Sequence, residues 1–143
     1  MHVRIIAVGN IREVFWENAI AEYEKRLTPF CKFEIIEIKE STPGEEAAEI
    51  KKKLKGPTVL FDVSGHLVTS ADVSTLINGY MQNGGQVTFI IGGSDGVGPY
   101  LYDVVDEKIS FGRVTMPHQL FRVVAVEQIY RAFTILNNKK YHK

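Results

Sequence analysis

Short apolar runs with strand character alternate along this chain with segments of helical periodicity, and this alternation is what most restricts its fold. The runs that we expect as strands are 3–8, 32–38, 58–63, 87–91 and 108–111. The segments that we expect as helices are 12–27, 45–54, 71–81, 100–105 and 117–136. Helices between successive strands make those strands parallel and cover both faces of their sheet. We therefore predict an α/β domain with a mostly parallel sheet flanked by helices.

The length and composition of the chain fit one such domain. A chain of 143 residues buries roughly 68 to 70% of its unfolded surface. Its residues are 45% hydrophobic and 24% charged, as in globular proteins. No repeat or long linker divides it, so we expect a single domain over 1–143. The first apolar run ends at Gly9, which is too short for a signal peptide or a membrane span and indicates a cytoplasmic protein.

Cysteine and metal chemistry have little support in this sequence. Cys31 is the single cysteine, which excludes a disulfide within the chain, and a buried, inert thiol is the favoured interpretation. The chain has no H-E-x-x-H motif, no Cys/His cluster and no paired carboxylates at ligand spacing. We expect no metal site.

Charge is distributed unevenly, although the formal net charge is zero. A net charge of zero argues against a general nucleic-acid binder. From residue 113 to the end, however, six cations stand against Glu127 alone. These cations are Arg113, Arg122, Arg131, Lys139, Lys140 and Lys143. Such a local excess indicates a surface for a polyanion.

A glycine-rich loop, IIGGSDGVG at 90–98, follows the most hydrophobic predicted strand. Glycines let a backbone approach a ligand closely and supply the positive φ of tight turns, and the two interpretations weigh equally on composition. Ligands of open parallel sheets bind beyond the carboxyl ends of the strands, which is where this loop lies. The loop lacks the spacing of a dinucleotide fingerprint and the Gly-Lys-Ser/Thr of a P-loop.

Two polar residues near these elements have structural interpretations that we weigh above functional ones. Asp95 could cap the following helix or bind a ligand hydroxyl, and capping is favoured. His118 lies in the first turn of the last predicted helix, where the helix dipole disfavours a cation. A neutral, hydrogen-bonded structural histidine is therefore the expectation there.

The last predicted helix is apolar around more than half of its circumference. One sheet face cannot cover so wide an arc, so we expect a second subunit to bury part of it, with Ile129 at the interface of a C2 homodimer. The alternative is a helix wedged between the sheet and the loops of its own chain.

The chain ends in Tyr141, His142 and Lys143, without an apolar partner nearby in the sequence. An exposed tail usually frays. An aromatic ring, an imidazole and a cation are also what stacking on a base and pairing with phosphate require. Both interpretations stand on the residues alone.

Several motifs along nearly the whole chain resemble the RlmH family of SPOUT-class methyltransferases. They are VGN near the start, EYEKRL at 22–27, FDVSG at 61–65, IGGSDG at 91–96, TMPHQLFRVVAVEQIYRAF at 115–133 and the terminal YHK. The resemblance implies methylation of N3 of a pseudouridine in large-subunit ribosomal RNA, with S-adenosylmethionine as cofactor. It also implies a SPOUT-type fold with a C-terminal trefoil knot, and a homodimer in which the tail of one subunit reaches the cofactor site of the other.

Site residues follow from the resemblance position by position. The implied cofactor contacts are Phe61, Gly92, Phe111, Gly112, Arg113, Val114, Thr115 and Met116. The implied catalytic residues are Tyr141 and His142, and the expected RNA contacts are Arg113, Arg122, Lys139, Lys140 and Lys143. The sequence departs from the family in having Phe61 where leucine is usual and Gly112-Arg113-Val114 where Ser-Lys-Met or Ser-Arg-Met is common.

The chemistry of this reaction suggests roles for these residues. A methyl transfer needs donor and acceptor in line, and the N3 proton must be removed or the anionic base stabilised. His142 is the candidate base from its titration range, with Tyr141 positioning the target. We expect the assembled ribosome as substrate, because the basic surface is small. The alternatives are a non-catalytic SPOUT-like RNA-binding or ribosome-assembly factor, and an unrelated nucleotide-binding α/β protein.

Overall fold

Five parallel strands form a single sheet in the order β2-β1-β4-β3-β5. The computed structural model describes residues 1–93 and 95–143, so Ser94 of the glycine loop lies outside the described residues. The strands are β1 (His2–Val8), β2 (Lys32–Ile38), β3 (Thr58–Leu67), β4 (Gln86–Ile91) and β5 (Glu107–Ser110). Every strand pairing is parallel, as the alternating pattern predicts. The predicted α/β fold is confirmed.

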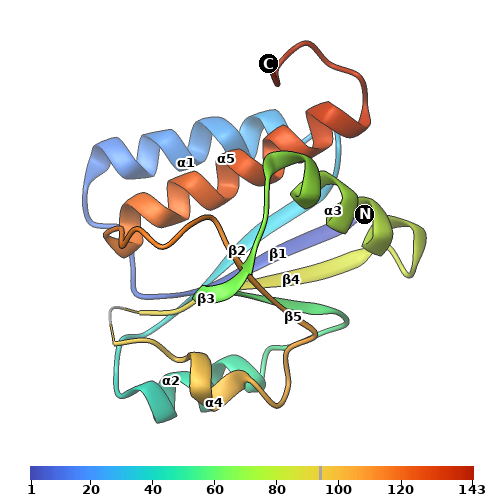
Figure 1. Cartoon of the computed structure of the whole chain (residues 1–143). Coiled ribbons are helices and arrows are strands. Elements are labelled where there is room, and N and C mark those ends of the chain that lie inside the picture. The colour runs from blue at the N-terminus through green and yellow to red at the C-terminus, as the bar shows by residue number, and fades with distance from the viewer. Residues whose placement is uncertain (94) are drawn as a thin grey trace.

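The helices cover both faces of the sheet (Figure 1). On one face lie α1 (Val14–Leu27), α3 (Ser70–Gln82) and α5 (His118–Leu136), with α5 between the other two. On the opposite face lie α2 (Pro43–Lys51) and the short α4 (Gly98–Leu101). The central strands are buried on both sides, which explains their continuous apolar runs: Ile5 packs into one core and Ile6 into the other.

Local sequence signals account for the starts of several helices. The Thr42 side chain accepts a hydrogen bond from Glu45 N, and Pro43 occupies the first turn of α2. Thr69 and Asp72 form a reciprocal capping box at the start of α3. These caps fix where the chain leaves the strand ends and enters the helices.

Most elements differ from their predicted bounds by one to three residues at an end, and β3 and α4 differ by four. Strand β3 continues four residues beyond its predicted end, because an irregularity between Phe61 and His66 lets it pair with β5 a second time. Gly65 permits this close pairing, since a Cβ there would lie 2.8 Å from the backbone of β5. Helix α4 starts and ends earlier than predicted, and the chain then turns so that Asp106 N donates to Thr58 O.

Helix α5 is wedged within its own chain. Ile129 is 1% exposed and belongs to the core between α5 and the sheet. The expectation that Ile129 lies at a subunit interface is therefore wrong, since the sheet and helices α1 and α3 cover that side of the helix. The outward side carries half-buried apolar residues and one ion pair: Leu120, Val123, Val124, Glu127 and Arg131.

Candidate active site

A cavity of about 460 Å³ opens where β3, β4 and β5 end, in the size range of small-molecule sites. The carboxyl ends of parallel strands are the usual place for a ligand. The loop after β4 forms one wall, and the loop between β5 and α5 forms another. Seven of the eight predicted cofactor positions line the cavity: Phe61, Gly92, Phe111, Gly112, Val114, Thr115 and Met116.

Arg113, the eighth predicted cofactor position, points away from the cavity lining. Its Nη1 donates to the carbonyl oxygens of Val63 and, at 3.0 Å, of Gly65. These bonds attach the loop after β5 to the extended end of β3. Arg113 thus holds a wall of the cavity in place, while its side chain remains at the surface.

Aromatic rings form the apolar floor of the cavity. Phe61 stacks on Phe89 with ring centroids 5.5 Å apart, and it contacts Phe111 and Phe121 at 5.2 Å each. Three of these rings, from β3, from the loop after β5 and from α5, also line the cavity. The phenylalanine at position 61, where the family usually has leucine, is accommodated by this aromatic cluster.

The glycine loop is shaped mainly by its own packing. A Cβ at Gly92 would lie 3.0 Å from Val97 Cγ2 and 3.3 Å from Val97 N, so the glycine lets the loop fold back on the strand end. Gly96 has φ +74°, which a glycine adopts at little cost. Gly96 thus takes the positive φ expected of a tight turn, and Gly92 makes room for Val97 of the same loop. Asp95 is exposed and does not line the cavity.

Asp62 contributes a carboxylate to the cavity wall, and the sequence interpretation missed it. Oδ2 accepts a 2.5 Å hydrogen bond from the Tyr102 hydroxyl, and Oδ1 accepts from Ser64 N and Ser64 Oγ at 2.9 and 2.8 Å. Burial raises the pKa of Asp62, but hydrogen bonds from Tyr102 and Ser64 outweigh it and hold the pKa below its usual value. A polar residue directly after a buried strand segment, in FDVSG, was the available signal.

His118 lies at the cavity wall in the first turn of α5. Its Nε2 would be 3.5 Å from a Cβ at Gly9, which has φ +90° at the end of β1. Pro117 precedes the helix and also lines the cavity. The start of α5 thus forms part of the cavity wall and lies beside the end of β1.

Arg122 is not a surface cation, and its expected role in RNA binding is wrong. It is 2% exposed, donates to Glu37 Oε2 at 2.6 Å and to Gly9 O at 3.0 Å, and connects α5 to the ends of β1 and β2. A guanidinium that is itself buried and bonded within the protein cannot meet a phosphate at the surface. Arg113, Lys139, Lys140 and Lys143 remain exposed.

The tail folds back on α5 instead of fraying. Asn138, with φ 55°, turns the chain, and Lys139 N donates to Thr134 O at 2.9 Å. Tyr141 then packs edge-on against Tyr130 with centroids 4.8 Å apart, beneath the guanidinium of Arg131. Burial, with Tyr23 and the carboxylate of Glu127 nearby, raises the pKa of Tyr141 to about 12.

His142 is held through one ring nitrogen. Arg131 Nη1 lies 3.1 Å from its Nδ1. A guanidinium only donates, so Nδ1 must accept, and the neutral ring then carries its proton on Nε2. Tyr141 packs against Tyr130 of α5. Tyr130 follows Phe121, which lines the cavity, by nine residues, or about 14 Å along the helix. Neither tail residue lines the cavity of its own chain.

Comparison with known families shows which family the chain belongs to. The model of a family described as "Predicted SPOUT methyltransferase" matches residues 1–142. The chain belongs to the SPOUT methyltransferase family. Members of this family use S-adenosylmethionine as the methyl donor. The cavity accordingly falls on the residues that the resemblance assigned to this cofactor.

Individual relatives of this SPOUT methyltransferase match over its whole length. The chain is 45% identical over 152 residues to "Ribosomal RNA large subunit methyltransferase H" of Mycoplasmopsis synoviae (strain 53), with both chains covered completely. It is 40% identical over 159 residues to the protein of that name from Limosilactobacillus reuteri (strain DSM 20016), again with complete coverage. It is 38% identical over 153 residues, with 99% of each chain covered, to that of Caldicellulosiruptor saccharolyticus. These relatives place it in the RlmH family.

The cavity of this SPOUT methyltransferase suits its cofactor. Phenylalanine rings offer an apolar surface to a purine, and the glycine loop lets the backbone approach. None of the helices that the structure describes is long and apolar enough to cross a membrane. Among residues 1–93 and 95–143, no group of three or more His, Cys, Asp or Glu is arranged to hold a metal ion.

Proposed function

We propose that this protein methylates N3 of a pseudouridine in large-subunit ribosomal RNA, with the assembled ribosome as its substrate. One observation carries the proposal: the cavity at the strand ends is lined by seven of the eight positions that the RlmH family assigns to S-adenosylmethionine, in a chain that matches RlmH proteins from end to end. A ribosomal substrate implies that the enzyme works in the cytoplasm.

S-adenosylmethionine supplies an electrophilic methyl carbon. The residues of this chain must hold it in line with the acceptor nitrogen and exclude water. Phe61, Phe111 and Phe121 supply the dry wall, and Arg113 fixes the loop that carries Phe111 by binding the carbonyls of β3. Rigid placement of this loop is what alignment of the reacting atoms requires.

In this proposal, His142 of the tail assists the loss of the proton from N3 of the target base. With Nδ1 engaged by Arg131, Nε2 of His142 faces outward and can donate to a carbonyl oxygen of the base as negative charge develops. To accept the N3 proton as the base that the sequence analysis proposed, Nε2 needs the other tautomer, in which Nδ1 carries the proton and Arg131 no longer donates to it. Tyr141 anchors this end of the chain beside Glu127 and Arg131.

A homodimer completes the site in this proposal. The tail contacts its own helix far from its own cavity, so a second subunit must bring a tail to each cavity. Two apolar areas support such a dimer: the outward residues Leu120, Val123 and Val124 of α5, and Val14 and Phe15 at the start of α1, which are 67% and 61% exposed. Arg12 N donates to Gln119 Oε1 at 2.9 Å and so brings these helix starts together.

Exposed cations near the two parts of the site are the proposed RNA contacts. Lys139, Lys140 and Lys143 lie on the tail, and Arg113 lies on the loop after β5. Phosphate contacts of this kind position an RNA without reading its sequence. A target base in an RNA loop can be splayed out into a site.

We further propose the trefoil knot of the family for this chain. The segment from β5 to α5 passes from the face with α4 to the face with α5 across the end of β3 (Figure 1). Val68 N donates to Ser110 O at 3.1 Å, and Arg113 binds Val63 and Gly65, so the crossing segment is bonded to the chain that it passes. These contacts support a threaded connection.

Two measurements test the proposed function against a non-catalytic binding factor. Calorimetry should show binding of S-adenosylmethionine by the purified dimer, and labelled methyl should pass from this cofactor to ribosomes that lack the modification. Binding without transfer would support the non-catalytic alternative. Absence of cofactor binding would contradict the proposed methyl transfer.

A further inference from the structure

The cavity is nearly free of charge. Among its described lining residues, Asp62 is the only acidic one and His118 the only basic one. The remaining lining is made of apolar side chains, glycines and a few hydroxyl-bearing residues. Asp62 therefore places the one carboxylate of the described lining in the cavity wall, and the Lys108 ammonium interacts with it from outside the lining.

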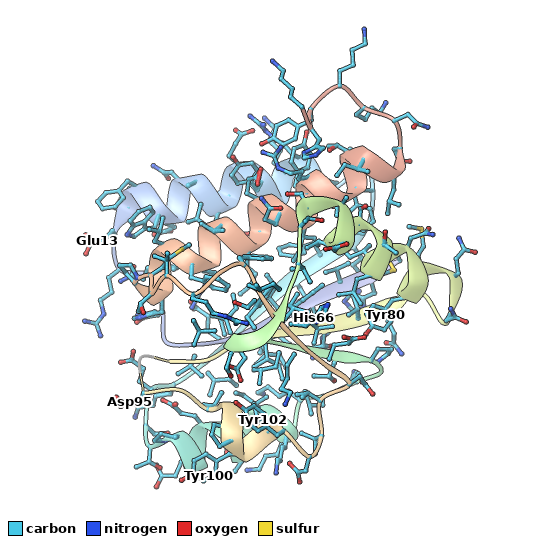
Figure 2. The ribbon with its side chains drawn as sticks, in the orientation of Figure 1. Glu13, His66, Tyr80, Asp95, Tyr100 and Tyr102 are labelled. Carbon is cyan, nitrogen blue, oxygen red and sulfur yellow. The ribbon has the colours of Figure 1, made fainter. Side chains whose placement is uncertain are left out.

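The Asp62 carboxylate is fixed in this position. Tyr102 and Ser64 donate three hydrogen bonds to it at 2.5 to 2.9 Å. Gly98 leaves the space for this arrangement, because a Cβ there would lie 3.1 Å from Asp62 Oδ2 and 3.2 Å from the Tyr102 ring. Figure 2 labels Tyr102 on the turn after α4, beside the sheet end. Lys108, a residue of β5, places its Nζ 4.2 Å from the centre of the same tyrosine ring.

Resting on the proposed function, we propose that Asp62 is a specificity residue that makes the cavity bind the cationic cofactor more tightly than its neutral product. S-adenosylmethionine carries a sulfonium charge, and S-adenosylhomocysteine differs from it by a neutral thioether. Their amino-acid ends are the same and carry one positive and one negative group each. Only the sulfonium distinguishes the two ligands in net charge.

Coulomb attraction carries this preference without a direct contact. The energy between two charges falls only as the inverse of their separation, and it grows where apolar walls exclude water. The fixed Asp62 carboxylate therefore attracts a sulfonium anywhere in the cavity, and this attraction disappears once the methyl group has left. The cavity then retains its substrate cofactor and releases the product more readily.

The test compares both ligands in one isosteric variant. In Asp62→Asn, the amide oxygen can accept from Ser64 and the amide nitrogen can donate to Tyr102, so the local packing stays possible. Calorimetry of the dimer should show that the Kd for S-adenosylmethionine rises about tenfold more than the Kd for S-adenosylhomocysteine. Thermal unfolding of the variant checks that it folds.

A matched control removes the same charge outside the cavity. Asp103 follows Tyr102 directly, its side chain is 73% exposed, and it does not line the cavity. Asp103→Asn should leave the ratio of the two Kd values unchanged. A third ligand, the analogue with an ammonium in place of the methylsulfonium group, should weaken in Asp62→Asn together with S-adenosylmethionine.

Any of three results would overturn the inference. Equal weakening of both ligands would mean that Asp62 contacts a group they share, and no change in either would remove Asp62 from recognition. If the variant did not fold, equal or tighter binding of S-adenosylhomocysteine by the wild type would still contradict the preference. Failure of the wild type to bind any of these ligands would instead reject the proposed function itself.

Discussion

The ring of Tyr141 meets the ring of Tyr130 edge-on, with centroids 4.8 Å apart, so the end of the chain is held on the helix that precedes it. Arg131 lies over the same ring and also binds His142. The two tail residues with proposed catalytic roles are therefore positioned by α5, whose first turn also lines the cavity.

Deleting Tyr141 to Lys143 should reduce methyl transfer far more than it reduces stability. We expect a loss of about 1 kcal/mol in the free energy of unfolding, from the lost aromatic contact, and loss of methyl transfer by orders of magnitude. Chemical denaturation and single-turnover rates measure the two effects. Deleting Lys143 alone is the control that keeps both rings. Full activity in the variant that lacks Tyr141 to Lys143 would contradict a catalytic role for the tail.

Replacing Arg122 by Leu should affect folding and not RNA affinity. The substitution removes bonds to Glu37 and to Gly9 O from a 2% exposed position. Because Glu37 is partly exposed, water screens what is left, and we expect a loss of about 2 kcal/mol. Urea unfolding measures this loss.

Replacing Lys139 by Ala, at an exposed site, should leave stability nearly unchanged and make ribosome binding less dependent on salt.

Adding one carbon at Gly92 should disturb the cavity through Val97. The Cβ of Gly92→Ala would lie 3.0 Å from Val97 Cγ2, so the loop must shift and cofactor affinity should fall at least tenfold. Calorimetry measures this, and Val97→Ala in the same chain should restore part of the affinity. Gly79→Ala is the control, because that site in α3 has open space and should gain up to about 1 kcal/mol of stability. Unchanged affinity in Gly92→Ala would place the cofactor elsewhere.

Two substitutions in α5 distinguish core from proposed interface. Ile129→Lys should unfold the protein, since it places a charge in the core of its own chain. Val124→Lys lies on the outward face and should yield a folded monomer. Light scattering and circular dichroism report the two properties. A dimeric Val124→Lys variant would remove this face from the interface.

The strand and helix pattern could be predicted because apolar periodicity is local. Strand β2 has the predicted bounds, β1, β3 and β4 differ at one end, and β5 begins and ends one residue earlier than predicted. The extension of β3 could not be predicted, because it depends on Gly65 meeting the backbone of β5, which lies far away in the sequence.

Most residues that line the cavity could be expected from motif resemblance, but the partners of individual side chains could not. Arg122 looked like one more cation in a basic segment, and only the fold places it beside Glu37 and Gly9. Asp62 and Tyr102 are 40 residues apart, and no local pattern connects them. The docking of Tyr141 likewise depends on a turn at Asn138 with positive φ.

Nucleoside analysis of ribosomal RNA by mass spectrometry tests the central claim most directly. Ribosomes without the modification would be incubated with the purified protein and S-adenosylmethionine, and their large-subunit RNA digested to nucleosides. We predict that N3-methylpseudouridine appears. It should be absent when the cofactor is omitted, and when Gly92→Ala replaces the wild type at limiting cofactor. A different methylated nucleoside, or none from a protein that binds the cofactor, would contradict the account.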